Sequence, residues 1–178
     1  METPEWIEEF ASPEVHRYAL EHFDIGDVAA TLAEIEKSRS LHADTDYRAS
    51  NESDIMLRKN WRATGSFIPE DRVQALDHMG FASQLVFPTV YNTLLEAMEH
   101  RSDDRLTYEM ADAANRAHVA FCDVDPRLLP VAYVPLATFD GARHASTVAL
   151  DAGAKALLIP NRCPRDHATS HVGLDPVW

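Results

Sequence analysis

The sequence predicts an α/β protein whose strands form a parallel sheet. Three short apolar runs, 83–88, 129–135 and 155–160, are each bounded by a proline or a turn residue. Runs of this kind are typical of parallel strands that are covered on both faces. Helical patterns separate them, and the pattern between the second and third runs has the length of a βα crossover. The alternation of helix and strand therefore indicates a parallel sheet with right-handed crossovers.

The first 60 residues carry helix signals and no strand signal. Ser12 and Pro13 match a capping residue followed by proline at the first helical position, and the helix should run to about Phe23. Gly26 and Asp27 open a second helix. The polar segment 40–60 is expected to be a long surface loop with one helical turn. We therefore divide the chain into a helical and loop region, 1–65, and an α/β region, 66–178.

The α/β region begins with a helix from Pro69 to Gly80, since glycine at this position commonly ends a helix in a left-handed conformation. The first strand follows, then a short helix over 93–100. Ser102 or Asp103 should cap the next, long helix. Its apolar side chains recur at helical spacing: Leu106, Met110, Ala113, Ala117 and Phe121.

The remaining elements follow the same alternation. A break at Asp125-Pro126 leads into the second strand, 129–135. Asp140 is expected to cap the following helix and Gly153 to end it, before the third strand, 155–160.

Composition limits the possible functions. The net charge is −13, and no block of Lys or Arg could follow a phosphate backbone, so nucleic-acid binding is not expected. No apolar run is long enough to cross a membrane, and the acidic N-terminus lacks a secretory signal. Cys122 and Cys163 form no CxxC pair and are expected to be inert thiols. These features together predict a cytoplasmic protein.

Parallel α/β proteins bind ligands at the carboxyl ends of their strands, which directs attention to the residues after each strand. Tyr91 and Asn92 follow the first strand and could form hydrogen bonds with a polar substrate. Asn161 and Arg162 follow the third, and the planar Arg162 side chain suits a carboxylate. We predict these four as substrate-binding residues. The alternative is that they, with Thr138 and Asp140 after the second strand, are ordinary residues that finish turns and cap helices.

The nine histidines give no metal-site pattern, since neither His-x-His nor HExxH occurs. His42 lies in a segment that is not a strand, and His167 and His171 lie in a loop. Histidines on helical patterns, His118 among them, are expected to be solvated or to cap helices. No GxGxxG after a strand, P-loop or GxSxG elbow is present either. The residues alone therefore identify no reaction type.

Several sequence pieces over residues 70–178 occur in an order and spacing that resemble the amidohydrolase-related metal-dependent TIM-barrel family, in the branch of aminocarboxymuconate-semialdehyde decarboxylase. The pieces are Arg72 with 76–80, 86–89, 114–118, 125–131, 134–136, 153–157, 160–161 and 174–178. The resemblance implies that the three strands are the second to fourth of a (β/α)8 barrel. It also implies a divalent metal, most often zinc, held by a His-x-His and further His and Asp residues. None of these ligands can be assigned to this chain, so we expect it to bind no metal alone.

We therefore expect a partial (β/α)8 TIM barrel, preceded by a helical region that the resemblance identifies as an insertion between the first two strands. A closed barrel needs about 250 residues, so 178 residues are too few. The expected function is that of a fragment of a hydrolase or decarboxylase for a small carboxylate or cyclic substrate, inactive in isolation. His171 joins the predicted substrate-binding residues because its loop should cross the mouth of the site. Unpaired strand edges would permit a homo-oligomer. The alternative is a non-catalytic α/β binding or interaction module.

Overall fold

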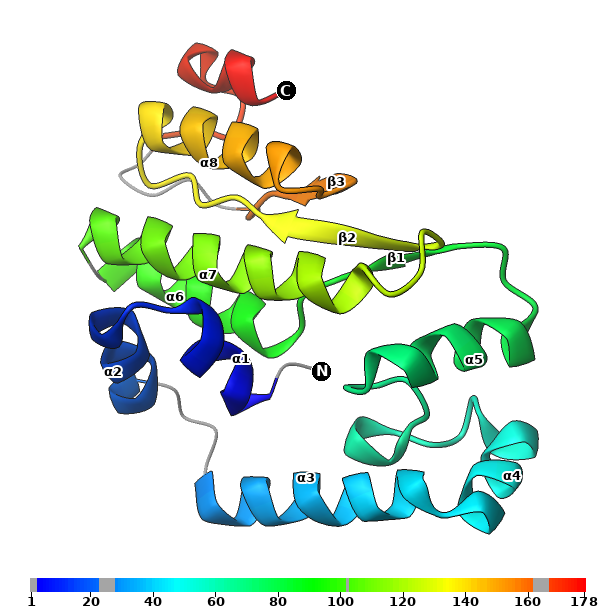
Figure 1. Cartoon of the computed structure of the whole chain (residues 1–178). Coiled ribbons are helices and arrows are strands. Elements are labelled where there is room, and N and C mark those ends of the chain that lie inside the picture. The colour runs from blue at the N-terminus through cyan, green and yellow to red at the C-terminus, as the bar shows by residue number, and fades with distance from the viewer. Residues whose placement is uncertain (1–2, 23–27, 102, 162–166) are drawn as a thin grey trace.

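The fold combines many helices with one small sheet (Figure 1). The computed structural model describes residues 3–22, 28–101, 103–161 and 167–178. The elements in chain order are α1 (Pro4–Phe10), α2 (Pro13–His22), α3 (Val28–Ala43), α4 (Thr45–Asp54), the 3-10 helix η1 (Asn60–Arg62), α5 (Pro69–Met79), β1 (Gln84–Val86), α6 (Val90–Arg101), α7 (Asp104–Cys122), β2 (Leu128–Tyr133), α8 (Phe139–Asp151), β3 (Ala156–Leu158) and the 3-10 helix η2 (Val172–Val177).

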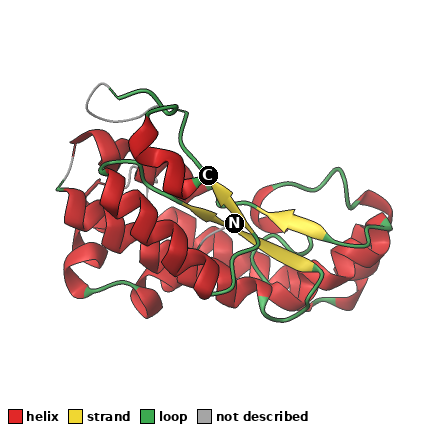
Figure 2. Ribbon diagram, turned by 90° about the horizontal axis from the view of Figure 1, so that it is seen from above, coloured by secondary structure: helices red, strands yellow, loops and turns green. Residues whose placement is uncertain are grey.

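The sheet has three parallel strands in the order β1-β2-β3, which confirms the predicted parallel α/β class. The strands lie side by side at the centre of the molecule (Figure 2). Gln84 pairs with Leu128, and Val131 pairs with Ala156. Each strand is shorter than its apolar run in the sequence, because backbone pairing stops where the registers of neighbouring strands no longer overlap.

The long helices α7 and α8 both pack against β2. Leu128 belongs to an apolar cluster with Phe121 of α7, and Ala132 belongs to a cluster with Ala149 of α8. Tyr133, whose side chain points to the opposite face from Leu128, also packs against α7 through Met110. The strands follow one another in chain order, with helices between neighbours.

The N-terminal helices α1 and α2 pack against the strand region. Helices α1 and α2 lie against α7 (Figure 1). Val15 and Ala19 of α2 are buried in one cluster with Met110 of α7 and Tyr133 of β2. The region 1–65 therefore shares a core with the strand region.

The sequence-based prediction for residues 40–60 is wrong, because α3 extends to Ala43 and α4 (Thr45–Asp54) occupies ten further residues of the supposed loop. Asp44 caps α4 by accepting hydrogen bonds from the backbone nitrogens of Asp46 and Tyr47 at 2.8 and 2.9 Å. The buried residue of α4 is Asn51, so this helix has a polar buried face. An apolar periodicity could not reveal such a helix.

Two capping predictions have different outcomes. Gly80 ends α5 with a left-handed φ of 70°, as predicted. The cap of α8 is Thr138, whose hydroxyl accepts a hydrogen bond from the Gly141 nitrogen at 3.1 Å. Asp140 lies in the first turn of α8, so the prediction of Asp140 as the cap is wrong by two residues.

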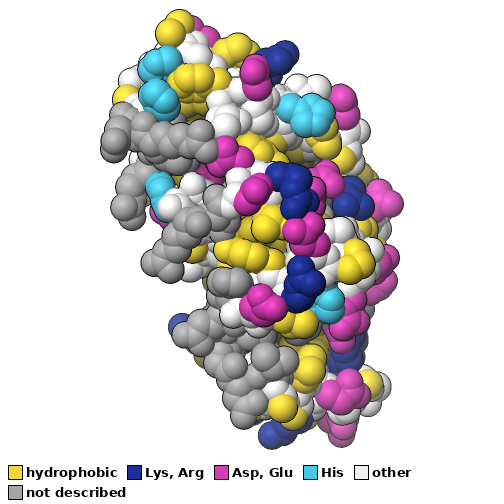
Figure 3. Space-filling view, turned by 90° about the vertical axis from the view of Figure 1, so that its left-hand side faces the viewer, with side chains coloured by type: hydrophobic (Ala, Val, Ile, Leu, Met, Phe, Trp, Pro, Cys, Tyr) yellow, Lys and Arg dark blue, Asp and Glu magenta, His cyan; other side chains and the backbone are white. Residues whose placement is uncertain are grey.

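Opposite charges alternate on the surface. Arg105 pairs with Glu14 at 2.9 Å and with Glu109 at 2.8 Å, and Arg116 pairs with Asp112 at 2.9 Å. The face seen in Figure 3 shows acidic and basic side chains mixed, without a continuous basic stripe. Within the described residues, the helices are too short or too polar to cross a membrane.

Candidate functional site

The predicted residues after β1 lie in the first turn of α6. Tyr91 is only 3% exposed, and its hydroxyl donates a hydrogen bond to the Thr3 carbonyl oxygen at 3.4 Å. It packs in the cluster that also holds Leu95 and Met98. Asn92 is half-buried beside it. Tyr91 thus holds α6 against the N-terminal segment, and its contact with a substrate stays a prediction.

The predicted residues after β3 lie toward the other edge of the sheet. Asn161 is exposed, and Arg162 lies outside the described residues. His171 caps η2, because its Nδ1 atom accepts a hydrogen bond from the Gly173 nitrogen at 3.0 Å. The His171 ring stacks on Phe139, with 4.6 Å between ring centroids. His171 therefore fixes the C-terminal turn against α8.

A pocket lies directly at the carboxyl end of β1, and we call it the β1-end pocket. Its volume is ≈ 380 Å³. Its wall combines the last residue of β1 with the segment between α4 and α5 and with two residues of α7. The lining residues are Arg58, Lys59, Asn60, Ala63, Ser66, Arg72, Val86, Phe87, Thr89, His118 and Phe121. Three of these side chains are basic and none is acidic, in a chain whose net charge is −13.

Arg72 is the most constrained cation of the β1-end pocket. Its Nη1 atom donates a hydrogen bond to the Gly65 carbonyl oxygen at 3.0 Å, and its Nε atom is buried without a partner among the described residues. Burial lowers the pKa of the Arg72 guanidinium below its ordinary value, an effect that the Cys122 thiol partly offsets. A half-buried cation that has no carboxylate partner among the described residues is costly, and a bound anion would reduce that cost.

A tight turn brings the chain close to Arg72. Gly65 has a φ of +74°, and a Cβ atom on it would lie 2.5 Å from the Arg72 Cα atom. Only glycine adopts this conformation and this approach without strain. The Gly65 turn therefore sets the position of the Arg72 guanidinium.

Two further basic side chains and one histidine also line the pocket. The Arg58 guanidinium lies 3.4 Å from an Asp54 carboxylate oxygen, while Lys59 is exposed. The Nε2 atom of His118 lies 2.7 Å from the Val86 carbonyl oxygen. His118 is buried, so the prediction that it is solvated or caps a helix is wrong. It instead links α7 to the end of β1.

The predicted substrate-binding residues were sought at the carboxyl ends of the strands, and none of those that the structure describes lines this pocket. Arg58, Lys59 and Arg72 are not adjacent to any strand in the sequence. One local signal exists, since the segment 55–69 holds three basic residues and no acidic residue in an acidic chain. Such a segment indicates a place where a negatively charged group could bind.

A buried carboxyl group lies at the end of β2. Glu99 of α6 is 5% exposed, and it accepts hydrogen bonds from the Tyr133 hydroxyl at 3.0 Å and from the Leu136 backbone nitrogen. Burial raises the pKa of Glu99 to about 7, against the opposing effect of the two hydrogen bonds. Glu99 can therefore hold or release a proton near neutral pH. Nothing in the local sequence distinguishes it from Glu96, one turn earlier.

The family resemblance implies a divalent metal, and the described residues do not fit one. Among them, no group of three or more His, Cys, Asp or Glu side chains could hold a metal ion. His42 is buried, but its Nδ1 atom has only the Asp71 carboxylate nearby, at 3.9 Å. We therefore derive no catalytic step through a metal.

Comparisons of the chain with known protein families, with curated proteins and with solved structures found no match. The family resemblance is thus carried by the sequence pieces alone.

Proposed function

We propose that this chain forms the substrate-binding part of a metal-dependent hydrolase or decarboxylase of the amidohydrolase-related barrel class. In this proposal the β1-end pocket binds the carboxylate of a small cyclic organic substrate. The observation that carries it is the set of three basic side chains, with no acidic one, in the pocket wall at the carboxyl end of β1. A metal, where the enzyme uses one, would be held outside the described residues.

The sheet supports a barrel origin. Sequential parallel strands with helices between neighbours are the arrangement from which a (β/α)8 barrel is built. Enzymes of that architecture place their substrates at the carboxyl ends of the strands. The β1-end pocket lies at such an end, next to Val86.

The chemistry of the wall favours a carboxylate on an apolar ring. Arg72 presents a planar guanidinium group, which matches the two oxygens of a carboxylate. Phe87 and Phe121 supply aromatic surface in the same wall. A substrate whose ring packs against Phe87 and Phe121 and whose carboxylate binds Arg72 would contact both the aromatic and the basic parts of the wall.

Titration calorimetry with benzoate tests this binding. We expect benzoate to bind and benzyl alcohol, its neutral counterpart, to bind at least tenfold more weakly, because a hydrogen bond to a charged group contributes about 1.5–3 kcal/mol. Arg72→Gln should lower the affinity for benzoate by about the same factor. The control is Arg116→Gln, which removes a surface arginine that does not line the pocket and should leave benzoate affinity unchanged. Equal affinity for the acid and the alcohol contradicts the proposal.

Turnover separates the enzyme from the alternative, a non-catalytic binding module. A panel of cyclic carboxylates with a ¹³C-labelled carboxyl group is incubated with zinc and with the product of the full native reading frame, because the 178 residues alone are expected to be inactive, and the label is followed by NMR. Label that appears in bicarbonate or in a hydrolysis product supports the enzyme. Ligands that bind and are recovered unchanged support the binding module.

A further inference from the structure

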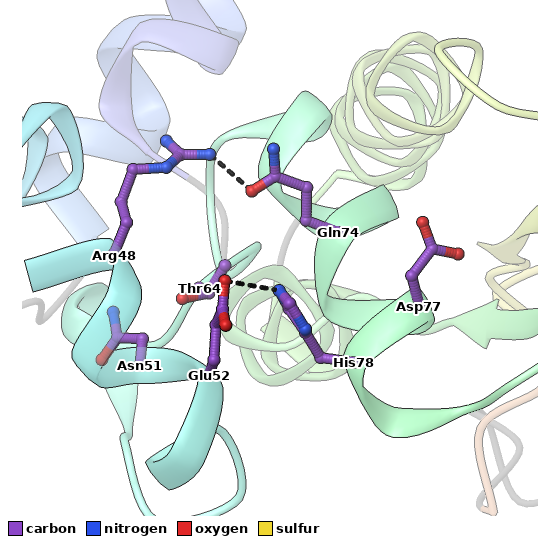
Figure 4. A pocket seen from close by; sticks show the side chains of 7 residues that line it. All are labelled: Arg48, Asn51, Glu52, Thr64, Gln74, Asp77 and His78. Carbon is purple, nitrogen blue, oxygen red and sulfur yellow. Dashed lines mark hydrogen bonds and ion pairs between the residues drawn. The ribbon is translucent and has the colours of Figure 1, made fainter. Parts of the chain in front are cut away.

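A second pocket lies between α4 and α5, and we call it the α4–α5 pocket. Its volume is ≈ 420 Å³. Figure 4 shows side chains that reach it from both helices, with Thr64 between them. The lining residues are Arg48, Asn51, Glu52, Thr64, Gln74, Asp77 and His78. The Gly65 turn separates it from the β1-end pocket, because Thr64 lines one pocket and Ser66 lines the other.

Each charged side chain of this wall lies close to a side chain that can carry the opposite charge. The pairs are Arg48 with Asp71 at 2.8 Å, Glu52 with His78 at 3.7 Å and Asp77 with Arg127 at 2.7 Å. In Figure 4 the Asp77 carboxylate is turned away from the Glu52–His78 pair. The charges of Arg48 and Asp77 are therefore already compensated, and Glu52 has the His78 ring beside it.

The unmet hydrogen-bonding capacity belongs to neutral groups. Asn51 is 2% exposed, and neither its side-chain oxygen nor its side-chain nitrogen has a partner among the described residues. The buried hydroxyl of Thr64 also lacks one. Buried polar groups without partners are rare and costly, and each calls for an explanation such as a bound molecule.

The Gln74 side chain adds a donor at the opposite side of the pocket. Its Oε1 atom accepts a hydrogen bond from Arg48 Nη2 at 2.6 Å. The amide nitrogen of Gln74 then remains as the group that can donate to a ligand. The wall thus offers one carbonyl acceptor and two amide donors, together with one hydroxyl.

We propose that the α4–α5 pocket binds a small neutral ligand through a primary amide group. A primary amide carries a carbonyl acceptor next to N–H donors, so it can form two parallel hydrogen bonds with the Asn51 side chain. Thr64 and Gln74 would satisfy its remaining donor and acceptor positions. This site is independent of carboxylate binding at the β1-end pocket.

The test is NMR titration of the ¹⁵N-labelled protein with acetamide, acetate and methylammonium. These probes have similar size and differ in charge. The signal of the Asn51 side-chain NH₂ group, assigned by its loss in Asn51→Ala, should shift and saturate with acetamide on the order of 10 mM, since a ligand of so few atoms binds weakly. Acetate and methylammonium should require at least tenfold higher concentration for the same shift.

Two internal controls make the result decisive. The Asn115 amide is buried and already bonded to Tyr133, so its NH₂ signal should not shift with any probe. Thr64→Val should weaken acetamide binding several-fold, because it removes one partner. An Asn51 signal that does not respond to acetamide, as expected if water alone occupies the pocket, overturns the proposal. Equal responses to acetamide and acetate overturn it as well.

Discussion

Two buried asparagines, Asn115 in the strand region and Asn51 in the region from α3 to α5 (the α3–α5 region), differ in their hydrogen bonds. In the strand region, the Asn115 side chain donates to the Tyr133 carbonyl oxygen at 2.9 Å and accepts from the Tyr133 nitrogen at 2.8 Å. In the α3–α5 region, the Asn51 side chain is equally deep, with 2% against 7% exposure, and has no partner among the described residues. Two buried asparagines on helices therefore have different hydrogen-bonding states.

This difference separates structural from ligand-binding polar groups. A polar group that is fully bonded inside a core specifies the fold, and its removal leaves its partners unpaired. A polar group that is buried without a partner adds nothing to stability until a ligand satisfies it. We therefore assign the buried polar groups around Tyr133 to stability and those around Asn51 to binding.

The largest loss of stability is expected from Asn115→Ala. The variant leaves the backbone N–H and C=O groups of Tyr133 buried and unpaired, at about 1–3 kcal/mol for each group. We expect the free energy of unfolding to fall by about 4 kcal/mol in urea titration. A loss below about 1 kcal/mol would show that water or another group replaces the amide.

Glu99 should make the stability of the strand region depend on pH. Its pKa is about 7 in the folded protein against an ordinary 4.5, so the folded state binds the proton more tightly. Its contribution to stability is complete below pH 4.5 and is lost as the pH rises to 7. The loss is about 3 kcal/mol, since one pKa unit corresponds to about 1.4 kcal/mol.

The Glu99→Gln variant checks this pH dependence by urea unfolding at pH 5 and pH 8. The fall in stability between the two values should become smaller in the variant, because glutamine does not ionise. The exposed Glu36 provides the control, and Glu36→Gln should leave the wild-type pH dependence in place. Identical pH profiles for the wild type and Glu99→Gln would contradict the prediction.

Gly65→Ala should affect both stability and the β1-end pocket. The added Cβ atom would lie 2.5 Å from the Arg72 Cα atom, and φ is +74°. Strain at such a position is of order 1–3 kcal/mol, so we expect a loss of about 2 kcal/mol in thermal unfolding. Benzoate affinity should fall too, because Arg72 must move. Gly80→Ala is the control, since nothing lies within 4 Å of its added Cβ atom and benzoate affinity should be unchanged.

The smallest changes in stability are expected at two buried threonine hydroxyl groups. Thr64 has an unpartnered hydroxyl in the α3–α5 region, whereas the Thr107 hydroxyl donates to the Asp103 carbonyl oxygen at 3.2 Å. Thr64→Val should leave stability unchanged or raise it by about 0.5 kcal/mol, and Thr107→Val should lower it by about 1 kcal/mol. Differential scanning calorimetry of the two variants measures the difference. The reverse order would contradict the comparison.

The sequence predicted the strand region better than the α3–α5 region for a physical reason. Strands β1, β2 and β3 are apolar runs bounded by turn residues, so their signal is local. Helix α4 buries Asn51, and no apolar pattern marks it. The cap of α8 was misplaced because both Thr138 and Asp140 are good capping residues, and only the backbone conformation distinguishes them.

The candidate site was harder to predict than the fold. The rule for strand ends directed attention to Tyr91 after β1, which lies in the helical core. The cations of the β1-end pocket come from Arg58, Lys59 and Arg72, which only the packing of α5 and the Gly65 turn brings to that end. Long-range packing of this kind leaves no periodic signal in the sequence.

The most direct test is the free energy of unfolding of Asn51→Ala measured beside that of Asn115→Ala. Both substitutions replace a buried helical asparagine by alanine, so the gain in helix propensity is similar in the two variants. We predict that Asn115→Ala loses about 4 kcal/mol, while Asn51→Ala is unchanged or gains up to about 1 kcal/mol. Equal losses in both variants would contradict the assignment of Asn51 to binding and of Asn115 to the fold.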